Sequence, residues 1–519
     1  MPRSLPHGSF TWRWIAGIAF CSLLPLTCPA QQLSAPRNDE AAGSLLPART
    51  KTPYAPAKQK PEPPEDRPIT KQLLSAALPI DLPTTLRLVN ENSPAIGLAR
   101  ARLAEAEARL AQTQVLAVPD LIGGVSYYRL DGNTQNQRGN VFSISRSNLY
   151  GFAGPRLRFA LADAIFLPLV ANRLTDAASS TVANTVNVSE YDAASAYLDL
   201  LSLHAALAIN RDTLTRAEQV LRYAQAAEEA GLAKTPADVD RARTEVSLLR
   251  KERLDLTGQI GIASARLAQL LLLKPGVNLK PADMTIVPLI LIPAETSLEE
   301  LIATATTYHP ELAAARQELA AMQTRVRQAK LSPLIPQFEI EYGIGGFGGG
   351  VNDQLGQFDT RSVLNATAFW ELENLGFGYT ARVQTRRAEQ LQTQYRLIEA
   401  EARIAATVAA AAKQAAAQFE GVDVAQAAVW EALEMYRKRR ETSFNMVGPR
   451  PQYDAREPLL AIRALNQARR NYLEAVIEFN RAQFRLFTAL GQPPISALAS
   501  ATSRPLSLPV VPAETDADR

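Results

Sequence analysis

Residues 171–230 contain neither glycine nor proline, the two residues that most readily end a helix. At about 1.5 Å per residue, a helix over this run would be a rod of roughly 90 Å. A second run, 379–447, is interrupted only by Gly421. Helices of this length gain most of their stability by packing an apolar face against neighbouring helices. The two runs therefore predict an elongated, mainly helical architecture.

The two runs belong to two copies of one unit. SPAIGLARARLAEAEARLAQ (93–112) resembles HPELAAARQELAAMQTRVRQ (309–328), and ARLAQLL (265–271) resembles FRLFTAL (484–490). The members of each pair are separated by nearly the same length of chain, which is the mark of an internal duplication.

Each copy has the same predicted order of parts. A helix opened by proline comes first, a β-like segment rich in glycine and aromatic residues follows, and a long helix and a return helix complete the copy. The predicted segments are 88–117, 121–167, 171–230 and 237–273 in the first copy and 310–331, 337–372, 379–447 and 455–490 in the second. Along the last of these, alanine recurs at the seven-residue period of a coiled coil.

The ends of the chain differ from this helical centre. Arg3 and Arg13 precede the apolar run Ile15–Leu26, and a positively charged region before a short apolar run is typical of a secretory signal. The only cysteines, Cys21 and Cys28, lie in this signal, so the exported chain would have no disulfide. Lipidation of Cys28 stays open because the residues before it make a poor lipobox. The predicted domains are a signal peptide (1–30), a proline-rich disordered linker (31–77), a first repeat (78–280), an inter-repeat linker (281–296), a second repeat (297–491) and a disordered tail (492–519).

The β-like segments alternate between apolar and polar residues with period two. The clearest apolar positions are Phe338, Ile340, Tyr342, Ile344, Leu157, Phe159, Leu161, Leu364, Ala366, Ala368 and Trp370. A half-buried soluble hairpin and a membrane-facing strand explain this alternation equally well. No apolar run after residue 30 reaches the roughly 18 residues of a transmembrane helix, so a membrane protein of this sequence would have to span as a β-barrel. About four strands per chain are too few to close a barrel, so several chains would complete it together.

The order of these parts resembles the TolC-like outer-membrane efflux and secretion channel family over residues 78–491. The resemblance implies a homotrimer whose long antiparallel α-helical barrel continues into a β-barrel completed by oligomerisation, with about four strands from each chain. It implies an exit channel of a tripartite efflux pump or a type I secretion system, in the cell outer membrane with its helices in the periplasm. The implied partners are a periplasmic adaptor, an inner-membrane pump or ABC transporter, and outer-membrane lipid.

The resemblance also assigns residues at the turn between the second long helix and its return helix. The family's pattern at this periplasmic tip is a glycine, an arginine two residues on, an aspartate four later and another acid three further on. Here those positions are Gly448, Arg450, Asp454 and Glu457, and Pro449 helps the chain to reverse. Since positions three apart share one helix face, we expect Asp454 and Glu457 to point together and form an acidic ring at the pore constriction.

The first copy has a matching tip turn. Gly231 matches the tip glycine, and the resemblance implies that Asp238 pairs with Arg450 to lock the entrance. The alternative is that Asp238 and Asp454 simply cap helices, because acids are common where helices begin.

The sequence offers little support for other functions. The near-balanced net charge of +3 argues against nucleic-acid binding. His204 and His309 have no metal-ligand or nucleophile pattern around them, so we predict no enzyme activity, metal or cofactor. The basic cluster 437–440 is either a solvated surface or an adaptor contact. The main alternative function is a soluble periplasmic coiled-coil adaptor or scaffold, and an exported helical enzyme is a weaker one. The sequence does not indicate an exported substrate.

Overall fold

The computed structural model describes residues 77–496, except 234, 236, 275, 294, 353 and 445–452, together with 502–503. All of them lie in the unit Asp66–Arg519, one of the two units into which the chain divides. The signal peptide, most of both predicted disordered segments, Cys28 and the tip residues Gly448, Pro449 and Arg450 lie outside the described residues.

The two halves of the described chain have the same order of elements. The helices are α2 (Leu82–Asn92), α3 (Pro94–Gln114), α4 (Leu161–Glu229) and α5 (Asp238–Leu270), then α6 (Leu298–Tyr308), α7 (Pro310–Leu331), α8 (Phe377–Phe444) and α9 (Arg456–Ala489). The long helices α4 and α8 contain 69 and 68 residues. None of the helices in the described part of the chain combines the length and apolar character needed to span a membrane.

Proline sets two of the helix starts. Pro94 and Pro310 each occupy the first position of a helix, after Ser93 and His309 in extended conformation. Proline is tolerated there because the first amides of a helix have no intrahelical partner. The expected first helix over 88–117 is therefore two helices, α2 and α3.

Four antiparallel strands form one sheet. They are β2 (Asp120–Gln135), β3 (Val141–Ala160), β6 (Gln337–Val351) and β7 (Gly356–Phe369), in the order β2-β3-β6-β7. The expected strand extension to residue 167 is wrong, because helix α4 already begins at Leu161 and includes Pro168. Each repeat contributes one hairpin, and the contact between β3 and β6 joins the repeats.

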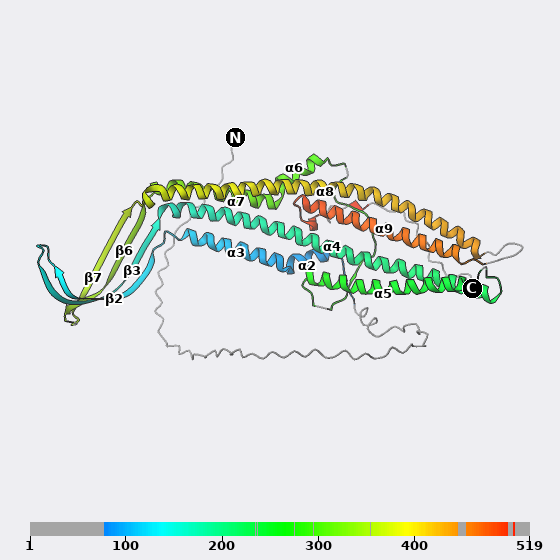
Figure 1. Cartoon of the computed structure of the whole chain (residues 1–519), viewed down its shortest axis with the longest axis horizontal. Helices are drawn as coiled ribbons and strands as arrows, with labels where there is room; N and C mark the ends of the chain where they lie inside the picture. The colour runs from blue at the N-terminus through cyan, green and yellow to red at the C-terminus, as the bar shows by residue number, and fades with distance from the viewer. Residues whose placement is uncertain are drawn as a thin grey trace, which may run out of the picture. The chain divides into compact units, whose positions relative to one another are not determined.

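Each strand is joined, directly or through a short connection, to a helix of the layer beside it. Helices α3, α4, α7 and α8 pack in that order, which is the order of the strands to which they are joined. Farther from the sheet, α5 and α9 replace α3 and α7, so that the order becomes α5, α4, α9 and α8. Figure 1 shows this helical layer and the strands at one end of it. The helices and the sheet thus form one continuous wall.

Short elements cover one side of this wall at mid-length. Strand β1 (Leu78–Ile80) pairs in parallel with β4 (Leu279–Pro281), and β5 (Leu289–Ile290) pairs antiparallel with β8 (Thr502–Ser503). The buried carboxylate of Glu190 on α4 accepts hydrogen bonds from Asn90 Nδ2 (2.5 Å) and from the Ile495 amide (2.8 Å). Burial raises the pKa of Glu190. These bonds attach α2 and the chain after α9 to the long helix α4.

Candidate functional site at the strand sheet and the helix turns

The four-stranded sheet has one apolar face. The pairing places the odd-numbered residues of β2 and β3 on the same face as the even-numbered residues of β6 and β7. This face carries Leu121, Val125, Tyr127, Leu149, Leu157, Phe159, Phe338, Ile340, Tyr342, Ile344 and Leu364. Leu121, Val125 and Leu364 are 85%, 76% and 66% exposed, so much of this face is open. Contiguous apolar surface of this kind marks a contact with lipid or another protein.

The opposite face carries most of the sheet's charged side chains. Arg156 Nη2 lies 3.1 Å from Glu341 Oε2, and Arg158 Nε lies 3.7 Å from Glu339 Oε1, both across the β3–β6 pair. The two charged strand residues on the apolar face, Arg129 and Asp131, pair with each other. A sheet with one apolar and one polar face can separate hydrocarbon from water.

Both edges of the wall lack a neighbour within the described residues. Strands β2 and β7 each pair on one side only. Helix α8 lies at the same edge as β7, and α3 and α5 lie at the edge of β2. Gly258 and Gly261 sit inside α5, where an added Cβ would meet no atom within 4 Å. Each glycine costs a helix about 1 kcal/mol relative to alanine, and bare backbone here leaves room for another helix to approach closely.

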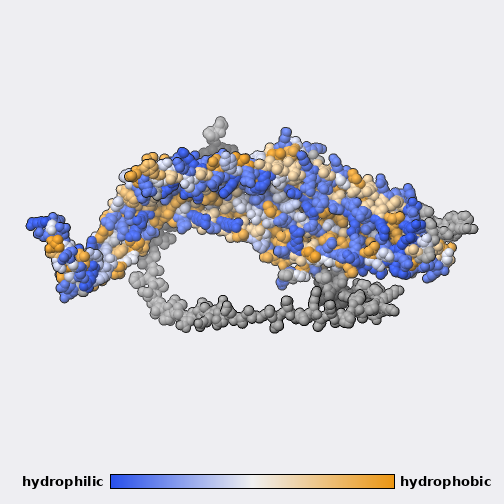
Figure 2. Space-filling model, viewed as in Figure 1, coloured by the Kyte–Doolittle hydropathy of each residue, from blue (hydrophilic) through white to orange (hydrophobic). Residues whose placement is uncertain are grey.

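Large apolar residues are exposed where β7 passes into α8. Trp370, Leu372, Leu375 and Phe377 are all more than half exposed, and Leu375 reaches 85%. Asn374 and Leu375 have positive φ angles of 50° and 55°, which is uncommon for residues other than glycine. In Figure 2, apolar residues gather where α8 begins in Figure 1. This patch directly follows the end of β7.

At the far end of the helices, the first turn reverses the chain after α4. Gly231 has φ +68°, and the Leu232 amide donates to the Ala227 carbonyl over 2.7 Å. This is the glycine-capped ending typical of helices, because glycine adopts the left-handed conformation without steric cost. Gly231 therefore occupies the turn between α4 and α5.

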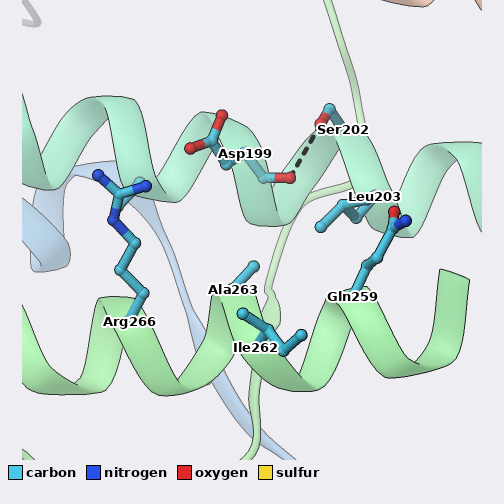
Figure 3. Close-up of a pocket in the computed structure, with 8 residues that line it drawn as sticks. Asp199, Ser202, Leu203, Gln259, Ile262, Ala263 and Arg266 are labelled. Atoms are coloured by element: carbon cyan, nitrogen blue, oxygen red, sulfur yellow. Dashed lines mark hydrogen bonds between the residues drawn. The ribbon is translucent and has the colours of Figure 1, made fainter.

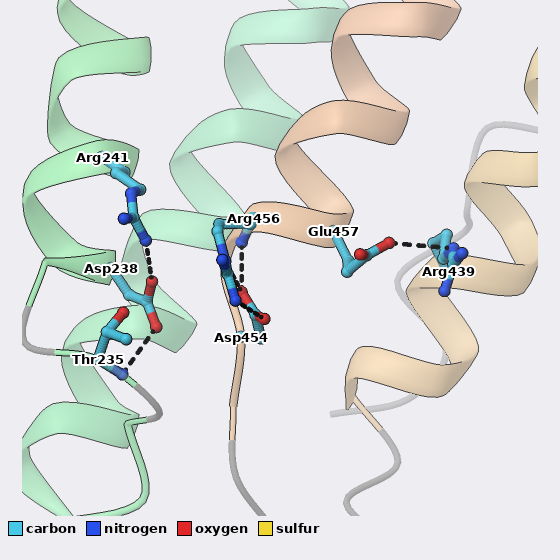
Figure 4. A network of polar contacts seen from close by, with 7 residues as sticks. All are labelled: Thr235, Asp238, Arg241, Arg439, Asp454, Arg456 and Glu457. Atoms are coloured by element: carbon cyan, nitrogen blue, oxygen red, sulfur yellow. Dashed lines mark hydrogen bonds and ion pairs between the residues drawn. The ribbon is translucent and has the colours of Figure 1, made fainter.

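Asp238 begins helix α5 and is 1% exposed. Its Oδ1 accepts from Arg241 Nη1 (3.0 Å), and its Oδ2 accepts from the Thr235 amide (3.3 Å) (Figure 4). The carboxylate thus fixes the preceding loop and bonds an arginine of its own helix. Its predicted partner Arg450 lies outside the described residues, so the Asp238–Arg450 lock stays a prediction.

Asp454 and Glu457 do not share a helix face. Helix α9 begins at Arg456, so Asp454 precedes it, and the expectation that helical spacing aligns the two carboxylates is wrong. Asp454 accepts from the Arg456 amide (3.0 Å) and from its guanidinium (2.9 Å). Glu457 Oε2 instead lies 3.3 Å from Arg439 Nε on α8. Figure 4 shows the two carboxylates turned to different partners.

Tyr453 joins the two turns, and the sequence analysis did not single it out. It is 1% exposed, its amide donates to the Leu232 carbonyl (2.9 Å), and its hydroxyl donates to the Val220 carbonyl (3.4 Å). Burial raises the pKa of its hydroxyl well above the usual range. An aromatic residue shortly after the Gly-Pro stretch of the turn was the available signal.

Ion pairs also join α9 to the neighbouring helices α5 and α4. Arg463 of α9 donates from Nε to Glu245 Oε2 of α5 (2.9 Å), and Arg481 of α9 pairs with Asp199 of α4. Beside Asp199 lies a groove of about 330 Å³ between α4 and α5, with Gln259 and Arg266 on its other wall (Figure 3). Asp199 is the one acidic residue among the described residues that line the groove, and it already pairs with Arg481.

The described residues contain no group of three or more His, Cys, Asp and Glu placed to hold a metal ion. His309 instead caps α7, where its Nδ1 accepts from the Glu311 amide (3.2 Å). Burial lowers the pKa of both His309 and His204.

Solved outer-membrane channels have the same fold. The outer-membrane channel OprN matches with a TM-score of 0.65 and 17% identity over 80% of this chain and 90% of that one. The outer membrane protein VceC of Vibrio cholerae matches with 0.64 and 16% identity over 79% and 96%. The MtrE outer membrane channel of Neisseria gonorrhoeae, in its open state, matches with 0.62 and 15% identity over 79% and 89%. No protein-family model and no curated protein matches the chain. The predicted resemblance to TolC-like channels is therefore confirmed as a likeness of fold.

Proposed function

We propose that this chain is one subunit of an outer-membrane exit channel, with its strands in the membrane and its helices in the periplasm. The observation that carries the proposal is a wall with two open edges and a sheet with one uncovered apolar face. The fold shared with solved outer-membrane channels supports it.

Lipid is the partner that fits the apolar face. Moving one large apolar side chain out of water stabilises by about 1.5–3 kcal/mol, and this face carries many such side chains. The exposed Trp370 and Phe377 lie where the strands end, as aromatic residues do at a membrane surface. A soluble adaptor or scaffold would leave all of this surface in water.

Copies of the chain are the partners that fit the open edges. Unpaired backbone groups at a strand edge cannot face hydrocarbon, because nothing there satisfies their hydrogen bonds. Pairing β7 of one copy with β2 of the next satisfies both edges and brings α8 beside α3 and α5. We propose that three copies close the wall, with the polar face of the sheet toward the water-filled interior.

We propose that the helix turns form the periplasmic entrance, where an adaptor and an inner-membrane pump or ABC transporter dock. Asp454 and Glu457 would place acidic groups from each copy around the opening, and Asp238 and Arg450 would form the closing pair. The chain would conduct small molecules or proteins from an efflux pump or a type I secretion system without covalent chemistry, so it would need no cofactor.

Membrane fractionation and planar-bilayer recording test the proposal. The full chain should require detergent for extraction, run as a heat-sensitive oligomer on an unheated gel, and give discrete current steps in a bilayer. A buffer-soluble monomer without current would favour the scaffold alternative and overturn the channel.

A further inference from the structure

Three aromatic rings form a continuous surface on the polar face of the sheet. Tyr150 and Phe152 alternate along β3 and stack with ring centroids 5.3 Å apart and planes 16° apart. Tyr150 faces Phe347 of β6 in the strand register, and those rings are 6.2 Å apart. We name Tyr150, Phe152 and Phe347 the aromatic platform.

Two glycines of the neighbouring strands face the rings of the platform. A Cβ at Gly343 would lie 3.5 Å from Tyr150 Oη and 3.8 Å from Phe152 Cδ2, and one at Gly124 would lie 3.3 Å from the Phe152 ring. The two rings thus occupy the space above strand positions that have no side chain. Tyr150, Phe152 and Phe347 are all partly exposed, and the π-face is the part of an aromatic side chain that stacks on planar ligands.

Arg361 of β7 lies against the platform. Its guanidinium carbon is 4.8 Å from the Phe347 ring centroid and 5.5 Å from that of Tyr150. By contrast, Arg156 and Arg158 on the same face each pair with a glutamate. Within the described residues, no hydrogen bond or ion pair engages the Arg361 guanidinium, so its N–H edges are available to an acceptor. Arginine stacked on an aromatic ring keeps these edges free for bidentate bonding to an oxyanion.

We propose that the aromatic platform and Arg361 bind planar aromatic anions, such as aromatic carboxylates or sulfonates, as these pass along the polar face. The aromatic ring of the ligand stacks on the rings of the platform, and its acidic group accepts hydrogen bonds from the Arg361 guanidinium. An aliphatic anion lacks the stacking surface, and a neutral aromatic molecule lacks the charge. The proposal rests on the proposed function, because only a channel places this face along a path for solutes, and a trimer would carry three such sites.

Equilibrium dialysis of 2-naphthalenesulfonate against the detergent-purified full chain tests the binding site directly, with empty micelles subtracted. Arg361→Gln and the double variant Tyr150→Leu/Phe152→Leu should each weaken binding at least tenfold. Two matched controls should bind as the parent does: Arg158→Gln on the same face and Tyr127→Leu on the apolar face. Cyclohexanesulfonate and 2-naphthol should bind at least tenfold more weakly than the probe.

Equal binding by parent and Arg361→Gln, or equal binding of naphthalene- and cyclohexanesulfonate, would overturn the site. Variant folding is checked by the unheated-gel oligomer. Planar-bilayer recording shows whether the binding site or the channel proposal has failed. If the parent conducts but 2-naphthalenesulfonate binds equally to all variants, the channel stands and the site fails. If the parent binds selectively but never conducts, the site stands as a surface feature and the solute-path proposal fails.

Discussion

Replacing Tyr453 by alanine should loosen the joint between the two helix turns. The side chain is buried among α4, α5 and α9, with Val220, Val239 and Leu459 in the same core cluster. Truncating a large buried aromatic residue costs about 3–5 kcal/mol. Tyr453→Phe keeps the ring and loses only the long hydrogen bond to the Val220 carbonyl (3.4 Å), which should cost at most about 1 kcal/mol.

Because Tyr453 lies at the end of the helices, the lost stability should appear as local opening of the turns. A loss of about 3 kcal/mol raises the equilibrium population of the open state, and with it the rate of amide hydrogen exchange, roughly a hundredfold. Hydrogen exchange by mass spectrometry should show this increase in peptides covering residues 226–242 and 453–462, with the strand peptides unchanged. Tyr453→Phe is the matched control and should exchange within about fivefold of the parent. Equal exchange in parent and Tyr453→Ala, or equal increases in both variants, would refute the role given to the ring.

Three further outcomes follow from the turns and the helix caps. Arg450→Ala should raise single-channel conductance if the Asp238–Arg450 pair holds the entrance, and unchanged conductance would remove the lock. Asp454→Asn should weaken block of the current by multivalent cations, and equal block would show that no acidic ring lies in the pore. The pKa of His309 is lowered by burial below its ordinary 6.5, so the neutral ring that caps α7 stabilises the fold above about pH 6.5 and this stability is lost as pH falls through the folded pKa. His309→Asn keeps an N-cap acceptor and should flatten that pH dependence in thermal unfolding followed by circular dichroism.

Local sequence patterns predicted the elements of the wall well. The run without glycine or proline marks most of α4, which also includes Pro168. Pro94 and Pro310 mark helix starts, and Gly231 follows the end of α4. The alternation over Phe338–Ile344 lies within β6, and the register places its apolar residues with Leu157 and Leu364 on one face. These signals are local because each depends on residues a few positions apart.

Contacts between distant segments were beyond the reach of those patterns. Tyr453 is buried because the turn after α4 approaches the start of α9, and Arg463 binds Glu245 from a different repeat. Helical spacing misplaced Asp454 because α9 begins only at Arg456, and the position of that start depends on the partners of the turn before it. The aromatic platform likewise needs three strands in register before its rings meet.

Disulfide crosslinking between the two edge strands tests whether copies of the chain complete the wall. Cys21 and Cys28 are the only cysteines and both lie in the predicted signal, so crosslinks in the exported chain would form only between the introduced cysteines. Leu364→Cys on β7 is combined in turn with Leu121→Cys, Val125→Cys or Tyr127→Cys on β2. At least one pair should give crosslinked trimers on a non-reducing gel, while a Leu157→Cys/Ile340→Cys control across the paired strands β3 and β6 should stay monomeric. Monomers from all three edge pairs in lipid would contradict the account.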